Sequence, residues 1–392
     1  MAAAIVLALI LTAGLSQPET ALAQETQEAE PPELGADSWA LVDAESGRYL
    51  DGGSSDERRA PAATANVMTV LIALEAGDLD SEVFVPEEAE SYVGFTYSNV
   101  GLIAGERLSV RELLQAAMIA SGTDATYTLA EHMGYGDTQR FVDRMNAKAR
   151  ELGLENTRFT NPLGVDEEGN YSSAGDLAVI AREAMKNPEF AEIVSAREAT
   201  ISTQTREIEL FNTNELLYAY PVSNGVKTGN SPQAGPSMIA SAEGDGRSYI
   251  AVVLGSDSAQ GVSNDARSVL QYGFGNYDSR PLVREREEFT RLPLPYKKGQ
   301  EVTLVADERV RALVGPGSEI EHRTNAREAP DSSQAGERLG SVEVFVDGVK
   351  VGESPLVTAD GYLRPSVWDK ARLAALWPIE RLSDSLRRYA AG

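Results

Sequence analysis

The chain has 392 residues, of which 42% are hydrophobic and 24% charged, which is ordinary for a soluble protein with two sizeable cores. Its formal net charge of -25 argues against a nucleic-acid partner, because phosphate binding needs clustered Lys and Arg. There is no cysteine, and His132 and His322 are the only histidines, so disulfides, thiolate chemistry and a histidine-built metal site are not expected. Any chemistry must therefore use hydroxyls, carboxylates or lysine, and we expect neither a metal nor a cofactor.

The N-terminal segment has the pattern of a secretory signal. Residues 2–15 form an apolar run too short to span a bilayer, and the small residues Ala21 and Ala23 suit a cleavage site before Gln24. No Lys or Arg precedes the run, so a disordered Ala-rich tail is the alternative. We predict a signal peptide at 1–23 and an acidic linker at 24–37. We then expect the mature protein to be exported and extracytoplasmic.

The next part of the chain predicts a hairpin followed by a buried helix. Residues 38–50 read as two strands that turn at 45–47. Pro61 presets a helical backbone angle, residues 62–75 are rich in helix formers, and Gly77 suits a helix end.

Helices and then strands follow, which indicates an α/β layer architecture. Helical spacing predicts helices over 110–121, 125–133 and 141–152, with Thr123 or Asp124 capping the second. Strands are predicted at 207–210, 225–228, 237–242 and 249–254. Glycines flank Lys227 and Thr228, so this strand edge permits close approach of a ligand backbone. The alternative is an ordinary edge strand with Lys227 in solvent.

The C-terminal third changes character. Prolines punctuate it, residues 301–305 and 341–351 alternate apolar and polar side chains, and Asp347-Gly348 is a hairpin turn. We predict an all-β domain at 281–366 with a mobile loop at 324–337. Residues 367–392 form a net basic amphipathic tail, split at Pro378, which suits an anionic membrane surface or packs on its own domain.

Several motifs occur in a fixed order between Ser38 and Tyr277. They are Pro61-Ala62 with Met68-Thr69, Ser121-Gly122-x-Asp124-Ala125, Gly225-x-Lys227-Thr228-Gly229 and Ala234-Gly235. In these motifs the chain resembles the D-alanyl-D-alanine carboxypeptidases, the low-molecular-mass penicillin-binding proteins. The resemblance implies an α/β (α+β) DD-peptidase/β-lactamase-like domain at 38–280. A small all-β sandwich domain and a C-terminal amphipathic helix would follow it.

The resemblance also assigns roles to positions. In that family the serine of S-x-x-K attacks the D-Ala-D-Ala carbonyl with the lysine as base, an S-x-N turn assists, and the lysine of K-T-G holds the substrate carboxylate. The register puts Ala63 at the serine, Asn66 at the lysine and Thr123 at the asparagine of S-x-N. A methyl group cannot attack a carbonyl, and an amide is no general base near neutral pH. The residues that keep the pattern, and that we expect to bind substrate, are Ser121, Lys227, Thr228 and Gly229.

Three functions fit these residues. The first is a catalytically defective cell-wall protein that binds the D-Ala-D-Ala end of peptidoglycan stem peptides, or a cell-wall synthesis protein. The second is an active D-Ala-D-Ala carboxypeptidase that uses a non-standard nucleophile, such as Ser121 with Lys227. The third is a scaffold that acts through its β-rich domain.

Overall fold

The computed structural model describes residues 30–295, 297, 299–364, 366–368 and 371. The predicted signal peptide, the first residues of the acidic linker and most of the predicted amphipathic tail lie outside these residues. Within the described part of the chain, no helix is long and apolar enough to cross a membrane.

A five-stranded antiparallel sheet forms the centre of the N-terminal part, in the order β2-β1-β9-β8-β7. The predicted hairpin is confirmed as β1 (Ser38–Asp43) and β2 (Tyr49–Gly53). Successive residues of β1 point to opposite faces, and all of them are buried. The remaining strands are β7 (Ser223–Gly229), β8 (Ser237–Gly244) and β9 (Arg247–Leu254), so the predicted strand around Lys227 lies at the edge of the sheet.

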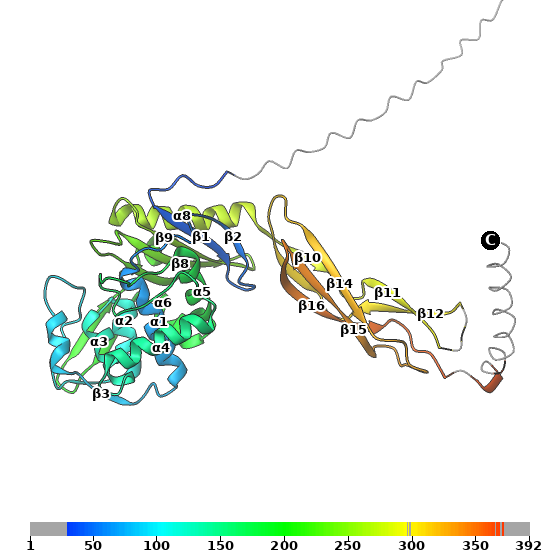
Figure 1. The fold of residues 1–392 in the computed structure, drawn as a ribbon, viewed down its shortest axis with the longest axis horizontal. Helices are drawn as coiled ribbons and strands as arrows, with labels where there is room; N and C mark the ends of the chain where they lie inside the picture. The colour runs from blue at the N-terminus through cyan, green and yellow to red at the C-terminus, as the bar shows by residue number, and fades with distance from the viewer. Residues whose placement is uncertain (1–29, 296, 298, 365, 369–370, 372–392) are drawn as a thin grey trace, which may run out of the picture.

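Helices cover both faces of this sheet (Figure 1). On one face α8 (Ala259–Asn276) packs against β8 and β9. On the other face α5 (Ala174–Met185) packs on β1 and β9, and α1 (Asn66–Ala76) lies against α5. The other helices of this layer are α2 (Val110–Ile119), α3 (Thr123–Met133), α4 (Thr138–Glu151) and α6 (Pro188–Ser195). The short α7 (Leu216–Ala219) contributes Leu216 to the core on the α8 side.

Short strands and a 3-10 helix extend the helical layer away from the sheet. The pairs are β3 (Glu82–Phe84) with β4 (Arg107–Ser109), and β5 (Glu198–Ser202) with β6 (Glu207–Phe211). The 3-10 helix η2 (Glu87–Tyr92) follows β3. The predicted strand at 207–210 therefore exists, but it belongs to a separate hairpin and not to the central sheet.

The C-terminal part is all β, as predicted. A pair of β10 (Asp278–Val283) and β13 (Val310–Val314) shares a core with a five-stranded sheet that includes the predicted Asp347-Gly348 hairpin. That sheet runs β11 (Glu288–Pro293), β12 (Glu301–Ala306), β16 (Val349–Thr358), β15 (Arg338–Val346) and β14 (Ile320–Ala326).

The prediction of a loop over 324–337 is wrong for residues 324–326, which belong to β14. This strand lies at the edge of its sheet and is almost wholly exposed, so its side chains carry no alternation of apolar and polar residues. The predicted domain boundary between 280 and 281 falls inside β10.

Candidate functional site

The first turn after Pro61 exposes one side chain. Between Pro61 and Leu74 every residue is buried except Ala63, which is partly exposed. This turn is a 3-10 helix, η1 (Ala62–Ala65), and the α-helix begins at Asn66, so the prediction of an α-helix from Ala62 is wrong. Ala62 has a left-handed backbone with φ of 47°, which is incompatible with α-helical geometry at that residue.

A close backbone contact holds that turn in place. Gly164 has φ of 74°, and a Cβ atom there would lie 1.8 Å from the carbonyl oxygen of Ala62. Only glycine fits at this position. The Thr64 hydroxyl, although adjacent to Ala63, is fully buried and donates to the carbonyl oxygen of Pro61, so it does not face the same space as Ala63.

Asn66 is buried, and only one of the two polar atoms of its amide has a hydrogen-bond partner. Its Nδ2 donates to Thr126 Oγ1 at 3.3 Å, and Thr126 in turn donates to the carbonyl oxygen of Gly122 at 2.8 Å. The Oδ1 atom of Asn66 has no hydrogen-bond partner, although it is buried. The side chain therefore joins helix α1 to the first turn of α3, but it offers no general base.

The turn at 121–124 is built differently from the predicted cap. Ser121 is buried with a left-handed φ of 58°, and Gly122 is the N-cap of α3 without any side-chain capping bond. The Asp124 carboxylate accepts from the backbone N–H groups of Val100 and Leu102, as well as from its neighbour Ala125. Asp124 thus fixes the preceding loop against the turn, because that loop has backbone donors with no partner of their own.

Lys227 is buried and not in solvent, which overturns the ordinary edge-strand alternative. Only 1% of the residue is exposed. Its Nζ lies 2.7 Å from Ser121 Oγ and 2.8 Å from the carbonyl oxygen of Thr228. Burial lowers the pKa of the Lys227 amine to about 7, because the charged form loses its hydration. Near neutral pH the amine is therefore part protonated and part free base.

The end of β7 meets the Ala63 turn. A Cβ atom at Gly229 would lie 3.0 Å from Thr64 N and 3.2 Å from Ala62 Cβ, so glycine lets the strand approach this closely. Thr228 is partly exposed, and its Oγ1 is 2.7 Å from Thr213 Oγ1. The structure therefore brings the three predicted segments together. It adds Thr213 and Thr126, which no sequence pattern indicated.

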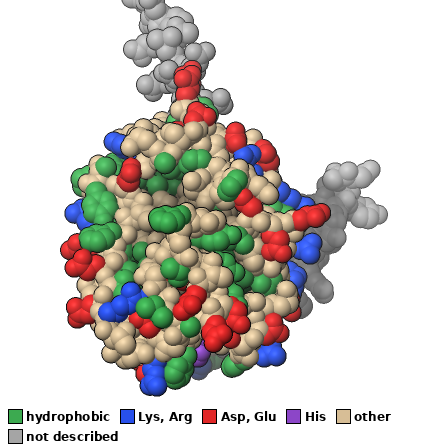
Figure 2. Space-filling model, turned by 90° about the vertical axis from the view of Figure 1, so that its left-hand side faces the viewer, with side chains coloured by type: hydrophobic (Ala, Val, Ile, Leu, Met, Phe, Trp, Pro, Cys, Tyr) green, Lys and Arg blue, Asp and Glu red, His purple; other side chains and the backbone are tan. Residues whose placement is uncertain are grey.

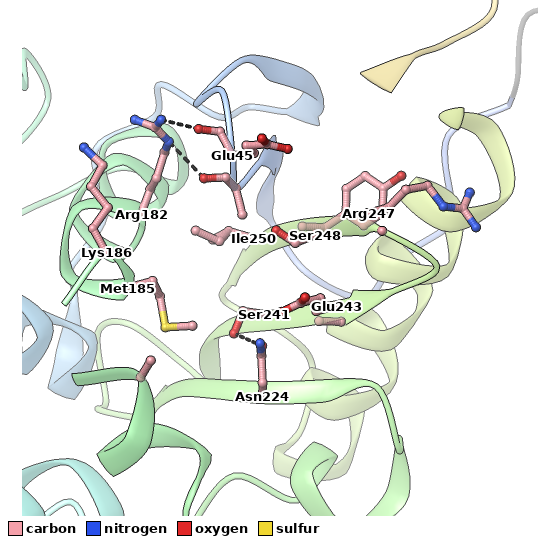
Figure 3. Close-up of a pocket in the computed structure, with 15 residues that line it drawn as sticks. Glu45, Arg182, Met185, Lys186, Asn224, Ser241, Glu243, Arg247, Ser248 and Ile250 are labelled. Carbon is pink, nitrogen blue, oxygen red and sulfur yellow. Dashed lines mark hydrogen bonds between the residues drawn. The ribbon is translucent and has the colours of Figure 1, made fainter. Parts of the chain in front are cut away.

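A cavity in the N-terminal part of the chain lies away from these residues. It has a volume of about 490 Å³ and is lined by α5 residues such as Arg182 and Met185 and by the opposite ends of the strands, including Asn224 and Ser241 (Figure 3). None of Ala63, Ser121, Lys227 or Thr228 lines it. Some of its polar groups bond to one another. Ser241 donates to Asn224 Oδ1 at 2.6 Å, and the Arg182 guanidinium donates to two backbone carbonyls.

Comparisons with known proteins agree on one family. The family described as D-alanyl-D-alanine carboxypeptidase matches residues 25–258. The chain is 32% identical over 335 residues to the D-alanyl-D-alanine carboxypeptidase DacF of Bacillus subtilis, covering 83% of this chain and 85% of DacF. It is 36% identical over 248 residues to DacB2 of Mycobacterium tuberculosis, covering 62% of this chain and 84% of the relative.

Solved structures show the same relationship. Penicillin binding protein 5 from Haemophilus influenzae aligns with a TM-score of 0.67 and 28% identity, covering 85% of this chain and 98% of that one. The Streptomyces K15 DD-transpeptidase aligns with a TM-score of 0.60 and 33% identity, covering 63% of this chain and 99% of that one. With the family match spanning more than half of the sequence, the chain belongs to the D-alanyl-D-alanine carboxypeptidase family.

Proposed function

We propose that this protein is exported and binds the D-Ala-D-Ala end of peptidoglycan stem peptides without forming an acyl-enzyme. One observation carries the proposal. Ala63 is the one partly exposed side chain of the turn that lies against Gly229, two residues after the Lys227 that contacts Ser121, and it ends in a methyl group. The predicted signal peptide and the membership of a cell-wall peptidase family support export.

The magnitude of the defect follows from how serine hydrolases work. Loss of the nucleophile alone lowers turnover on the order of a million-fold, because the catalytic groups act as a unit. Asn66 removes the base from the same turn, and its amide is already turned toward Thr126. Neither change removes the groups that contact a bound peptide.

Groups suited to binding remain in place. A carboxylate that reaches Lys227 would pair with its ammonium form by charge-assisted hydrogen bonds, and the Thr228 hydroxyl lies on the next residue. The edge of β7 offers an extended peptide a strand to pair with. A ligand that ends in a free carboxylate therefore fits this site better than a neutral one.

The test is calorimetric titration of the mature protein with an acylated peptide ending in D-Ala-D-Ala, together with an assay for released D-alanine. The matched control ligand is the same peptide as its C-terminal amide, which lacks the charge. We expect binding of the acid, weaker binding of the amide and no release of D-alanine. Release of D-alanine, or equal affinity for acid and amide, would contradict the proposal.

A second candidate function rests on the 2.7 Å contact between Lys227 Nζ and Ser121 Oγ. In this reading the free amine of Lys227 takes the Ser121 proton while Oγ bonds to the carbonyl carbon of the substrate. The carbonyl C–N bond then breaks, and the Lys227 ammonium returns the proton to the leaving nitrogen. In the second half of the reaction, Lys227 would take a proton from water as the water oxygen bonds to the acyl carbon. The bond to Ser121 Oγ would then break, and Oγ would receive the proton from Lys227.

Intact-mass spectrometry after incubation with a penicillin separates the two candidates. The first predicts no adduct on the unmodified protein and an adduct on the Ala63→Ser, Asn66→Lys double variant. The second predicts an adduct on the unmodified protein that maps to Ser121 and disappears in Ser121→Ala. An adduct that persists in Ser121→Ala would reject both assignments.

A further inference from the structure

The outer strand β14 has one backbone edge without a partner strand. It lies at the end of the five-stranded sheet of the C-terminal part and pairs with β15 alone. All of its residues except Ala326 are exposed. Among the described residues, no backbone hydrogen bond joins its other edge to the rest of the chain. An edge of this kind can accept a further strand.

The pairing with β15 shows which residues face that edge. Just before the strand, the carbonyl oxygen of Glu319 accepts from Asp347 N. Just after it, Arg327 N donates to the carbonyl oxygen of Leu339. In an antiparallel ladder, residues whose N–H and C=O groups face the neighbouring strand alternate with residues whose groups face away. The odd-numbered residues of β14 therefore bond to β15, and the even-numbered residues direct their backbone groups outward.

β14 lacks the features that usually protect an exposed edge. Proteins block such edges with a proline, a β-bulge or a covering segment. The opposite edge of the same sheet, β11, has a register shift after Glu288 and ends at Pro293. β14 has seven residues, no proline and an unbroken ladder. This edge is therefore suited to a partner strand.

The side chains of β14 are complementary to a second copy of the same strand. Glu321 and Arg323 form an ion pair on one face, with 2.8 Å between Arg323 Nε and Glu321 Oε1. The Arg323 guanidinium also lies 4.0 Å from the centre of the Phe345 ring, which holds it on that face. When two copies pair antiparallel about a two-fold axis at His322, Glu321 of each copy lies opposite Arg323 of the other.

Charge selects this register over its neighbours. Moving the axis by one residue toward the N-terminus puts Glu321 opposite Glu321, and moving it toward the C-terminus puts Arg323 opposite Arg323. Like charges directly opposite each other destabilise a strand pair. An axis at His322 also makes residues 320, 322 and 324 the hydrogen-bonded positions, as their outward backbone groups require. About six hydrogen bonds then join the two strands.

The net charge of the chain makes a local match of this kind necessary. The formal net charge is -25, so two copies repel each other. Figure 2 shows acidic side chains spread over the end of the molecule that carries α3, at the other end from the C-terminal part. The sequence of β14 holds one Glu, one Arg and one His, so this edge is close to neutral. Two copies can therefore approach here with less repulsion than at the acidic end.

We propose that two copies of this chain associate through β14, antiparallel about His322, so that their two five-stranded sheets become one continuous sheet. The interface is small, so the dimer is weak, with a dissociation constant on the order of 100 µM. The site around Ala63 and Lys227 lies in the other part of the molecule (Figure 1), so the inference does not depend on the proposed ligand.

Sedimentation velocity of the full mature chain from about 5 to 500 µM measures the association. We expect a change from monomer to mostly dimer, because this range brackets the dissociation constant. Thr324→Pro removes an outward N–H group and no hydrogen bond to β15, so it should weaken association at least about tenfold. Glu288→Arg, at an exposed ion pair on the opposite edge of the sheet, is the matched control and should leave association unchanged.

Charge reversals test the register. Glu321→Arg alone places like charges opposite each other when the variant pairs with itself, and so does Arg323→Glu. Each variant should therefore stay monomeric over the whole concentration range. An equimolar mixture of the two should associate again, because each arginine then lies opposite a glutamate of the other variant. Circular dichroism of each variant alone checks that it is folded.

Each outcome decides the inference. An unmodified chain that stays monomeric at 500 µM would overturn it. Association that survives a folded Thr324→Pro would show that the copies meet through another surface, which also overturns it. Failure of the two reversed variants to associate when mixed would overturn the register at His322, and this arm decides the matter if Thr324→Pro does not fold.

Discussion

Replacing Lys227 by Met tests the central physical feature of the site, a buried amine. In an unfolded chain the lysine amine keeps its proton up to its ordinary pKa of 10.5, whereas burial lowers the pKa in the folded protein to about 7. Below pH 7 the buried, protonated amine therefore lowers the free energy of unfolding by about 5 kcal/mol, before its hydrogen bonds are counted. Between pH 7 and 10.5 the unfolded chain binds more protons, so the free energy of unfolding rises with pH.

The difference between these two pKa values sets the expected change in the free energy of unfolding between pH 7 and pH 9. From pH 7 to 9 the Lys227 contribution rises by about 2 kcal/mol, which corresponds to about 4–8 °C in melting temperature for a domain of this size. Burial also raises the pKa of Tyr249 and Tyr272, and their contribution falls as pH passes the ordinary tyrosine pKa of 10. Measurements at or below pH 9 therefore isolate Lys227.

The assay is thermal unfolding followed by circular dichroism at pH 7, 8 and 9. The unmodified protein should gain stability across this range, and Lys227→Met should be more stable at pH 7 with a flat pH profile. Its net gain at pH 7 is about 2–3 kcal/mol, because two hydrogen bonds worth about 1 kcal/mol each are lost with the amine. Lys186→Met, at a half-exposed lysine, is the control. A pH profile unchanged by Lys227→Met would refute the argument.

Three further predictions follow from single contacts. The affinity for a peptide acid that ends in D-Ala-D-Ala should weaken above pH 7, because the ligand carboxylate needs the ammonium form of Lys227. The expected loss is up to about tenfold per pH unit, and calorimetry at pH 6.5, 7.5 and 8.5 measures it. Asn66→Leu should raise the free energy of unfolding by about 1 kcal/mol in urea titrations, since it removes the unpaired buried Oδ1; a loss of stability would contradict this. Hydrogen bonds from Arg206 lower the pKa of Glu106 to about 2, so its stabilising contribution is present above pH 4.5 and lost as pH falls toward 2. Glu106→Gln should therefore lower stability at pH 7 and reduce the loss on acidification, as urea titrations at pH 7 and 3 would show.

Sequence patterns anticipated the parts of the fold that bury one face against a core. The helix after Pro61, the strand around Lys227 and the hairpin at Asp347 all follow from spacing and turn residues. The sequence patterns did not predict the backbone conformation where it depends on a contact with a distant part of the chain. Ala62 is left-handed beside Gly164, some 100 residues away in the chain, and no local signal marks such a meeting.

In the candidate site, too, the sequence predicted some features and missed others. The structure puts Ser121 and Lys227 within hydrogen-bond distance of each other, and it puts the turn that carries Ala63 against Gly229 at the end of β7. The sequence could not show that Lys227 is buried, since a lysine between two glycines on an edge strand is ordinarily exposed. The role of Thr126 was equally hidden, because it depends on how the amide of Asn66 turns.

Retention of the strained and buried features argues for a ligand and against simple drift. Ala62 and Ser121 have left-handed backbones, each at a cost of order 1–3 kcal/mol, and the buried amine of Lys227 has a net cost of about 2–3 kcal/mol at pH 7 after its two hydrogen bonds are counted. A chain that had lost every use for the cleft would gain stability by replacing these residues, and many single substitutions would do so. Positions 63, 66 and 123 depart from the family pattern, and the first two are the groups that would make and break a covalent bond. That selectivity is what a site kept for binding predicts.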